Sequence, residues 1–179
     1  MMKIVQTPNK VLTQQTKAVI VFDSKLKKLV IDMEETLIAQ VDPQGVGLAA
    51  TQVALDSALF IIKPHPEADT EVCINPSVLE LDWNFPPKNK KKKDADETPL
   101  EGCLSIPAIW SPVKRAYRVH LAFQDINGKH LEKWYKGFEA IIIQHEVDHL
   151  NGILFTQRAL EQRIIMYRES GDELKKIEF

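Results

Sequence analysis

The sequence predicts an α+β fold, with antiparallel β-sheets packed around a central helix, a second helix near the N-terminus and a β-hairpin at the C-terminus. Two observations support this prediction. Segments with strand-like alternation lie both before and after one apolar helical segment, residues 138–149. These strands do not alternate with helices, as the βαβ units of a parallel sheet would require. A chain of 179 residues, 44% of them hydrophobic, is long enough for one core, so we expect a single domain over residues 1–179.

The first helix is predicted from an amphipathic segment. Apolar residues recur at helical spacing from Leu26 to Val41, and Asp23 or Ser24 can cap the start. The spacing gathers the apolar residues on one face, which we expect to pack on the core without a chemical role.

Four segments are predicted as strands. Residues 58–62 and 72–81 are rich in branched and aromatic side chains. Apolar residues alternate along 117–123, and an Asn127-Gly128 turn leads into residues 131–135. Because Asn-Gly is a preferred pair for a two-residue turn, the last two segments predict a β-hairpin.

The central helix carries the segment that bears most directly on function, His145-Glu146-Val147-Asp148-His149. Histidines at i and i+4 lie on the same face of a helix, so both imidazoles can bind one metal ion. Glu146 stands beside the first ligand and can take a proton from a water at the metal. The alternative is a buried helix whose histidines are only hydrogen-bonded core residues. Two histidines with an adjacent glutamate make that alternative the less favoured interpretation.

The same helix contains a stripe that we expect to be buried. At spacings of i, i+3, i+4, i+7 and i+11 stand Phe138, Ile141, Ile142, His145 and His149. Asn151-Gly152 follows, and a glycine in the left-handed conformation often ends a helix. The helix is therefore predicted to end at about residue 151.

A catalytic metal usually has a third protein ligand, and Cys103 is the strongest candidate. A thiolate binds zinc or ferrous iron well, and the neighbouring Gly102 lets the backbone approach the ion closely. A free cysteine is more often a small buried hydrophobic residue. A metal ion held by the two histidines of the helix would still lack a third protein ligand, and this favours metal binding by Cys103. A Cys73–Cys103 disulfide is a further alternative, incompatible with the ligand role.

A zinc peptidase is one competing class of enzyme. It would take its third ligand from Glu169 or Glu173 in a later helix. Residues 163–168 and 173–179, however, flank a Ser170-Gly171-Asp172 turn and predict a terminal β-hairpin rather than a helix.

A structural metal site is the other competing class. It would require a fourth protein ligand that closes the site. The available histidines are His120, on a predicted strand, and His130, after a turn. Neither is well placed for this role.

Three segments resemble the signature motifs of peptide deformylases, and they occur in the order found in that family. They are Gly45-Val46-Gly47-Leu48-Ala49-Ala50-Thr51-Gln52, Glu101-Gly102-Cys103-Leu104-Ser105 and Gln144-His145-Glu146-Val147-Asp148-His149. Weaker similarity extends from Ile4 to about Phe155, so the resemblance covers most of the chain. It implies removal of the N-formyl group from the N-terminal formyl-methionine of nascent polypeptides, with release of formate.

The resemblance also implies roles for residues around the metal. Negative charge that forms on the formyl oxygen would be met by the Gln52 side-chain amide and the Leu104 backbone N–H. Gly47 would approach the formyl group through its backbone, and Glu146 would act as the general base. The implied metal is Fe²⁺ in the cell, with Zn²⁺, Ni²⁺ or Co²⁺ as substitutes. The ligands alone suit zinc and ferrous iron alike.

A methionine substrate needs an apolar pocket beside the metal. The predicted substrate-binding residues are Val46, Glu101, Gly102, Phe138, Ile141 and Ile142. Val46 and Gly102 would pair through their backbone with the extended substrate, as in strand addition. The three helix residues precede His145 on its face and would line the pocket, with plain core packing as the alternative for at least one of them.

Trp110 departs from the family pattern, because many members carry an arginine at about this place. Contacts with the peptide beyond methionine are therefore open in this chain. Lys114 and Arg115 lie nearby and could make such contacts, although a surface role is the stronger expectation.

Composition limits the partners and the location. A net charge of −2 and a pI near 6.2 argue against nucleic acid as the main ligand. The N-terminus lacks a signal or transit pattern and no apolar run approaches membrane-spanning length, so we expect a cytoplasmic protein without membrane contact. Residues 86–98 hold a Lys-rich run that we expect to be a mobile loop. Such a run is usually solvated, and transient contact with the ribosome is the alternative.

Overall fold

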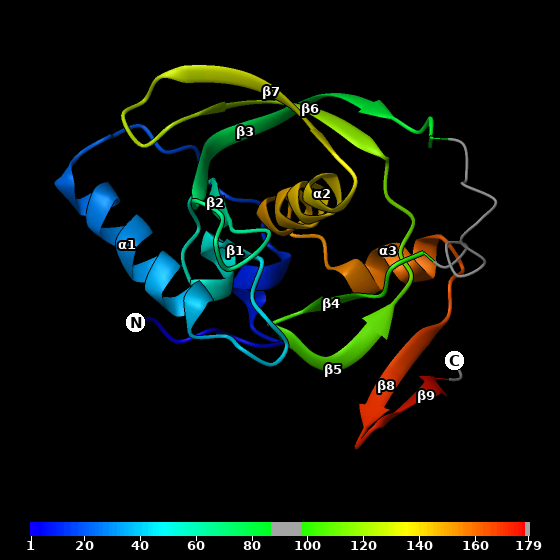
Figure 1. Cartoon of the computed structure of the whole chain (residues 1–179). Coiled ribbons are helices and arrows are strands. Elements are labelled where there is room, and N and C mark those ends of the chain that lie inside the picture. Colours follow the sequence, from blue (N-terminus) through cyan, green and yellow to red (C-terminus); the bar gives the residue numbers. More distant parts are fainter. Residues whose placement is uncertain (87–97, 178–179) are drawn as a thin grey trace.

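The computed structural model describes residues 1–86 and 98–177 of the chain. The fold is α+β, as predicted, and helix α2 (Phe138–Leu150) lies at its centre (Figure 1). One antiparallel sheet covers α2 on one side, and strands of a second sheet lie on the opposite side. Most of the predicted Lys-rich loop, residues 87–97, lies outside the described residues.

The two sheets differ in size. The first has the strand order β1-β2-β3-β6-β7, with each strand antiparallel to its neighbour. Its strands are β1 (Gly47–Ala49), β2 (Leu59–Ile62), β3 (Glu71–Asp82), β6 (Arg118–Gln124) and β7 (His130–Lys136). The second has the order β4-β5-β8-β9. Its strands are β4 (Glu101–Cys103), β5 (Ile106–Ser111), β8 (Met166–Ser170) and β9 (Glu173–Ile177). Among the described residues, β1 and β4 each have one edge without a partner strand.

The predicted N-terminal helix is confirmed as α1 (Ser24–Ile38). It begins after Asp23, whose carboxylate accepts hydrogen bonds from the backbone N–H groups of Lys25 and Leu26. The helix ends before Val41, which is 81% exposed. Its apolar face packs against β1 and β2, as the amphipathic spacing predicted.

The predicted strands and both predicted hairpins are also confirmed. Strands β2 and β3 occupy the segments expected at 58–62 and 72–81, and β6 pairs with β7 around the Asn127-Gly128 turn. Alternation along β6 buries Val119, Leu121 and Phe123 in the cluster that contains α2. Strands β8 and β9 form the C-terminal hairpin.

Helix α2 ends as predicted, because Asn151 caps it and Gly152 adopts a φ of +71°. A Cβ atom on Gly152 would lie 2.7 Å from the backbone of Thr13, so glycine is needed for the close approach as well as for the turn. The expectation of a uniformly buried stripe is wrong at its start. Phe138 is 51% exposed and Ile141 is half-buried, because the first turn of α2 lies at the rim of a pocket.

The sequence did not predict several short elements. These are helix α3 (Phe155–Glu161), strands β1, β4 and β5, and the 3₁₀ helices η1 (Lys10–Thr13) and η2 (Ala50–Val53). Four of them, β1, β4, η1 and η2, have only three or four residues, which is too short for periodicity to be recognised. None of the helices in the described parts of the chain has the length and apolar character needed to cross a membrane.

Candidate metal centre and active site

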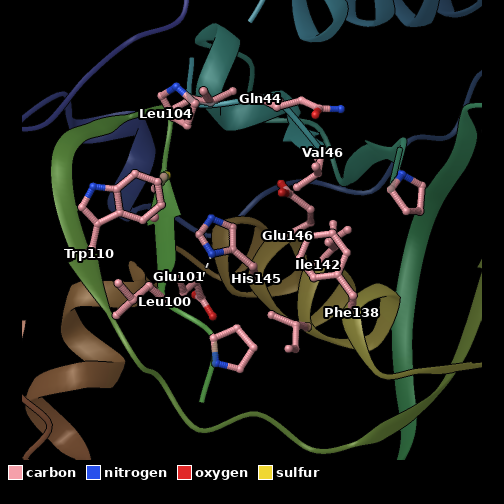
Figure 2. Close-up of a pocket in the computed structure, with 18 of the residues that line it drawn as sticks. Gln44, Val46, Leu100, Glu101, Leu104, Trp110, Phe138, Ile142, His145 and Glu146 are labelled. Carbon is pink, nitrogen blue, oxygen red and sulfur yellow. Dashed lines mark hydrogen bonds and ion pairs between the residues drawn. The ribbon is translucent and has the colours of Figure 1, made fainter. Parts of the chain in front are cut away.

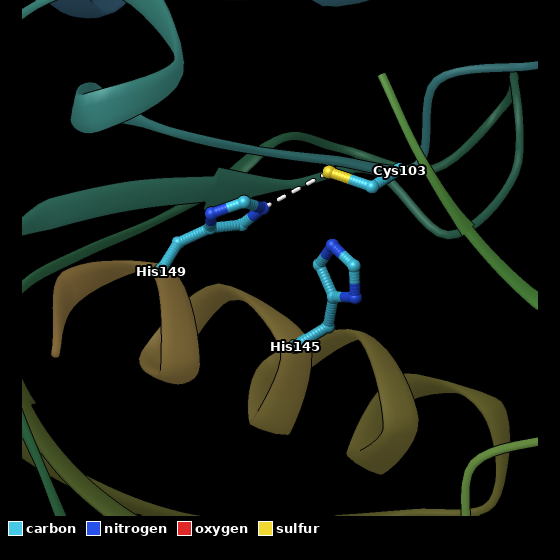
Figure 3. A group of neighbouring side chains, drawn as sticks. All are labelled: Cys103, His145 and His149. Carbon is cyan, nitrogen blue, oxygen red and sulfur yellow. Dashed lines mark hydrogen bonds between the residues drawn. The ribbon is translucent and has the colours of Figure 1, made fainter. Parts of the chain in front are cut away.

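Three side chains converge on one point between β4 and α2. Cys103 comes from β4, and His145 and His149 come from successive turns of α2 (Figure 3). The Cys103 Sγ and His149 Nε2 atoms are 3.2 Å apart, and the ligand atoms of all three residues lie within 4.8 Å of one another. Two ligands bound at about 2.3 and 2.1 Å in a tetrahedral arrangement would be separated by roughly 3.6 Å. The donor set and its spacing therefore fit one metal ion, and the site could bind one.

The protonation state of Cys103 also suits metal binding. Burial alone would raise the pKa of the Cys103 thiol, but the charge and hydrogen bonds of His149 and His145 lower it to about 5. A thiolate is the form that binds metals. The His145 Nδ1–H donates to Glu101 Oε1 at 2.7 Å, which orients the ring so that Nε2 could bind a metal ion.

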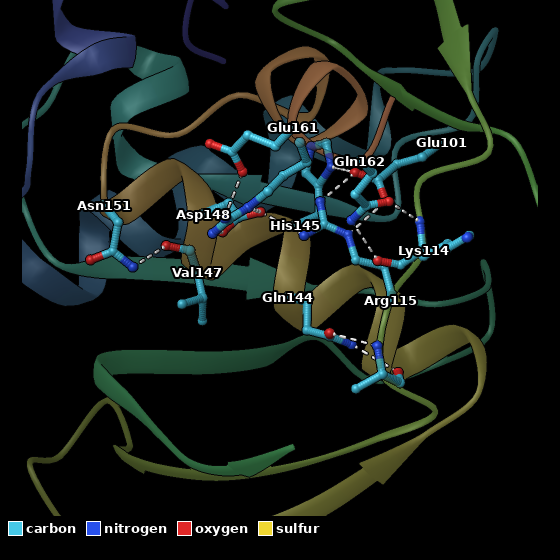
Figure 4. A network of polar contacts seen from close by, with 12 residues as sticks. Glu101, Lys114, Arg115, Gln144, His145, Val147, Asp148, Asn151, Glu161 and Gln162 are labelled. Atoms are coloured by element: carbon cyan, nitrogen blue, oxygen red, sulfur yellow. Dashed lines mark hydrogen bonds and ion pairs between the residues drawn. The ribbon is translucent and has the colours of Figure 1, made fainter. Parts of the chain in front are cut away.

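A buried ionic network holds Glu101 in place (Figure 4). Arg115 donates to both oxygens of Glu101, at 3.0 and 2.6 Å, and to Asp148 Oδ2 at 2.5 Å. Arg158 of α3, whose side chain is more exposed than that of Arg115, binds the same Asp148 carboxylate. Burial would raise the pKa of Glu101, but His145 and Arg115 outweigh it and lower the pKa to about 2. Glu101 is therefore a carboxylate that orients His145, a candidate metal ligand.

The expectation that Arg115 lies on the surface is wrong. Only 8% of Arg115 is exposed. Its guanidinium forms ion pairs with both Glu101 and Asp148. No local sequence signal marks this role, because the need for a positive charge arises only when Glu101 and Asp148 are buried near each other in the fold.

Gln144, which precedes the first histidine, fastens α2 to the segment before β6. Its side chain accepts from the Ala116 N–H at 2.9 Å and donates to the carbonyl groups of Ala116 and Ala140. Both functions of the amide are thereby satisfied. Gln144 thus fixes the position of the helix and does not point at the metal ligands.

Glu146 is almost fully buried, with 3% of its surface exposed. Within the described parts of the chain, its Oε2 atom has no hydrogen-bond partner. Burial raises the pKa of Glu146 to about 7, against the opposing charges of His145 and His149. A Cβ atom on Gly47 would press against this carboxylate and lie 2.8 Å from Ile142 Cγ2. Glycine at position 47 therefore lets β1 approach Glu146.

The Gln52 side chain is held in one orientation beside the ligands. Its Oε1 atom accepts the Ala49 N–H at 2.9 Å, so its Nε2 atom faces the Cys103 sulfur at 3.6 Å. The residue is buried, although a position after a loop would leave an ordinary glutamine exposed. The amide N–H groups therefore face the place where the metal ligands meet.

A pocket of about 370 Å³ opens in front of these groups (Figure 2). It brings together all of the predicted substrate-binding residues with Gly47, Gln52, Leu104, His145 and Glu146. Phe138 and Ile142 stand on one side of it, and Trp110, Leu100 and Leu104 stand on the other. The lining is mostly apolar, as a pocket for a methionine side chain would require.

The residues of the competing interpretations lie elsewhere. Glu169 accepts a hydrogen bond from the Trp110 indole, and Glu173 lies in the same hairpin. His120 stacks on Trp134, on the first sheet. None of these belongs to the metal-ligand group found among the described residues, and Cys73 and Cys103 are both free thiols.

Comparison with known proteins identifies the family. A model of the polypeptide deformylase family matches residues 1–163. The chain belongs to this family. The predicted resemblance is confirmed, and membership makes the chain an enzyme, a metal-dependent hydrolase that removes formyl groups from polypeptides. The chain is 36% identical over 172 residues to the peptide deformylase of Desulfotalea psychrophila, covering 94% of this chain and 93% of that protein. It is 39% identical over 161 residues to that of Dictyoglomus turgidum, covering 90% and 94%.

Solved structures of deformylases have the same fold. The crystal structure of peptide deformylase from Thermotoga maritima matches with a TM-score of 0.75 and 34% identity, over 88% of this chain and 97% of that one. The enzyme from Synechococcus elongatus in complex with actinonin matches with a TM-score of 0.75 and 33% identity, over 88% of this chain and 78% of that one.

Proposed function

We propose that Cys103, His145 and His149 hold one divalent metal ion, Fe²⁺ in the cell. The reaction is hydrolysis of the N-formyl group from the terminal formyl-methionine of nascent polypeptides. The observation that carries the proposal is the convergence of three metal-ligating side chains beside a buried glutamate with a free oxygen, at the base of an apolar pocket. A metal bound there would supply Lewis acidity for a water and for the formyl oxygen.

Glu146 is the proton carrier of the proposed reaction. Its Oε2 atom has no partner in the described chain and can accept a proton from the attacking water. The formyl C–N bond breaks and a C–O bond forms, so the proton is then needed on the departing methionine amine. Glu146 returns it there, and the products are formate and a free N-terminus.

Gln52 and Leu104 are the proposed donors to the formyl oxygen. The Gln52 amide is oriented by Ala49 before substrate arrives, so its donation requires no rearrangement. The Leu104 backbone N–H directly follows the ligand Cys103. Gly47 lets the β1 backbone approach the reacting group, because any side chain there would meet Glu146 and Ile142.

The pocket and the two open strand edges account for substrate binding in this proposal. Phe138, Ile141 and Ile142 surround the methionine side chain. The substrate backbone runs between β1 and β4, whose free edges offer N–H and C=O groups. The Val46 carbonyl already accepts from Lys63, so its N–H is the group offered to the peptide. Since the substrate is a nascent chain, we place the enzyme in the cytoplasm, in transient contact with the ribosome.

Metal analysis combined with a formate-release assay tests the proposal. Protein purified without oxygen should contain about one iron per chain, and it should release formate from formyl-Met-Ala. Zn²⁺, Ni²⁺ and Co²⁺ should each restore some activity to the metal-free protein. Formate release that persists after complete metal removal would contradict the proposal, as would cleavage at an internal peptide bond.

A further inference from the structure

A second cavity, of about 410 Å³, adjoins the active-site pocket. Leu100 and Trp110 line both, so the two cavities meet around the Trp110 side chain. The far wall of the second cavity is the tip of the β8–β9 hairpin. This wall consists of Glu169, Gly171, Asp172, Glu173 and Leu174.

The indole of Trp110 is fixed between the two cavities. Its Nε1–H donates to Glu169 Oε2 at 2.9 Å, which ties β5 to the hairpin. The ring lies over the β4 backbone, since a Cβ atom on Gly102 would stand 2.7 Å from Trp110 Cζ3. Trp110 therefore forms a rigid apolar wall along the path out of the active site.

In the proposed binding mode, the peptide leaves the active site along this path. A peptide that lies on the free edge of β4, with its formyl group at Cys103, continues past Gly102 and then past Leu100. Extended chain advances about 3.3 Å per residue, so the second cavity lies within reach of the first residues after methionine.

The described part of the second cavity carries charge of one sign. Of the described residues that line it, three carry carboxylates and none carries a basic side chain. Lys175 lies 3.9 Å from Glu173 and partly neutralises it. Glu169 and Asp172 therefore supply most of the negative charge, while Leu100, Trp110 and Leu174 offer apolar surface to an alkyl stem.

We propose that this second cavity binds a lysine or arginine side chain in the first two residues after the formyl-methionine. The aliphatic stem packs on Trp110 and Leu174, and the cationic head faces Glu169 and Asp172. Trp110, Glu169 and Asp172 are then specificity-determining residues for the deformylase reaction. This inference rests on the proposed function, because it requires a formyl-methionyl peptide in the first pocket.

The test compares formyl-Met-Ala-Lys and formyl-Met-Lys-Ala with the matching glutamate peptides at low salt. The measured quantity is the ratio of kcat/KM for the lysine peptide to that for the glutamate peptide at the same position. Exposed ion pairs of this kind should give a ratio of about two to five in at least one position. A ratio near one at both positions overturns the inference. The preference should fall towards one in about 0.5 M salt, because the carboxylates are exposed to solvent.

Two variants test whether the carboxylates of the second cavity cause the preference for lysine over glutamate. The double variant Glu169→Gln and Asp172→Asn should bring the ratio close to one. Because each ratio is measured with one enzyme sample, differences in the active fraction cancel. Glu80→Gln is the matched control, since it removes an exposed carboxylate from β3 in the other sheet and should leave the ratio unchanged. An unchanged ratio in the double variant, or an equal fall in the control, overturns the inference.

The dipeptide formyl-Met-Ala separates the two claims. It fills the first pocket and does not carry a charged side chain to the second. If no formyl peptide releases formate, the proposed function fails and the inference fails with it. If formyl-Met-Ala is hydrolysed while the lysine preference is missing, only the inference about the second cavity fails.

Discussion

At the scale of single residues, three groups of the candidate active site have their charge or orientation set before substrate binds. The Cys103 thiol is held as a thiolate, the His145 ring is oriented by Glu101, and the Gln52 amide is turned by Ala49. Glu146 differs from them, because one of its oxygens has no partner in the described chain. A buried acceptor left without a partner costs about 1–3 kcal/mol, and in the proposed reaction this oxygen gains a partner when it takes the water proton.

Replacing Glu146 with glutamine should remove most of the activity and leave the metal bound. The amide keeps the size of the side chain but cannot accept the water proton, and loss of a general base costs roughly two to four decades in rate. Formate release and metal content should be measured on the same preparation. Glu139→Gln on the first turn of the same helix is the control and should stay active. Near-normal turnover in the Glu146 variant would remove this residue from the mechanism.

Replacing Gly47 with alanine should lower the turnover number on the order of a hundredfold while the protein remains folded. The new methyl group would meet the Glu146 carboxylate and Ile142 and displace the proton carrier. A displacement of about 1 Å can cost on the order of a hundredfold in rate, whereas one extra methyl group in a packed site costs about 1–3 kcal/mol of stability. Kinetic assays and denaturant unfolding measure the two effects separately. A variant with full turnover would contradict the close approach of β1.

At the scale of elements, the candidate metal centre lies between a strand of one sheet and the helix at the centre of the molecule. The segment between β5 and β6, which carries Arg115, also connects this strand to the helix. This residue binds Glu101 of β4 and Asp148 of α2 at the same time. Arg115 therefore sets the distance between the elements that supply the ligands, and it is a positioning residue without contact to the substrate pocket.

Replacing Arg115 with lysine should weaken metal binding by roughly ten- to a hundredfold, the usual effect of disturbing the partners of metal ligands. An ammonium group retains the charge but cannot form the forked bonds to Glu101 while reaching Asp148. Competition with a metal chelator measures the affinity directly. Arg158→Lys is the matched control, because Arg158 binds the same Asp148 from a partly exposed position and should have a smaller effect. Equal effects of the two variants would show that Arg115 acts only through stability.

At the scale of the whole molecule, the long elements and the three residues that meet at the candidate metal site could be predicted from the sequence. Helices α1 and α2 carry clear periodicity, and the Asn127-Gly128 turn fixes the β6–β7 hairpin. The missed elements β1 and β4 have three residues each, and they are strands only because neighbours pair with them. The buried position of Arg115 was missed for a similar reason. Its partners are 14 and 33 residues away, and only tertiary contacts bring them together.

Metal removal should destabilise the whole chain. The ligands on β4 and α2 are separated by more than forty residues in sequence, and a bound ion favours the folded state that brings them together. A ligand at a thousand times its Kd contributes about 4 kcal/mol, which corresponds to roughly 8–16 °C in Tm for a chain of this size. Thermal unfolding with and without a chelator measures the shift. Cys103→Ser should show little of it, and an equal shift in that variant would place the ion elsewhere.

The free edges of β1 and β4 have a consequence for the range of polypeptide substrates that one such enzyme can accept. Main-chain hydrogen bonds are identical for every amino acid except proline, so an edge that captures backbone accepts almost any protein's N-terminus. Selectivity is then confined to the group being removed and the first side chain, which newly made proteins share. Charges further along can only modulate the rate. A cell could therefore process a whole proteome with one catalyst, provided that each chain is still unfolded when its N-terminus arrives.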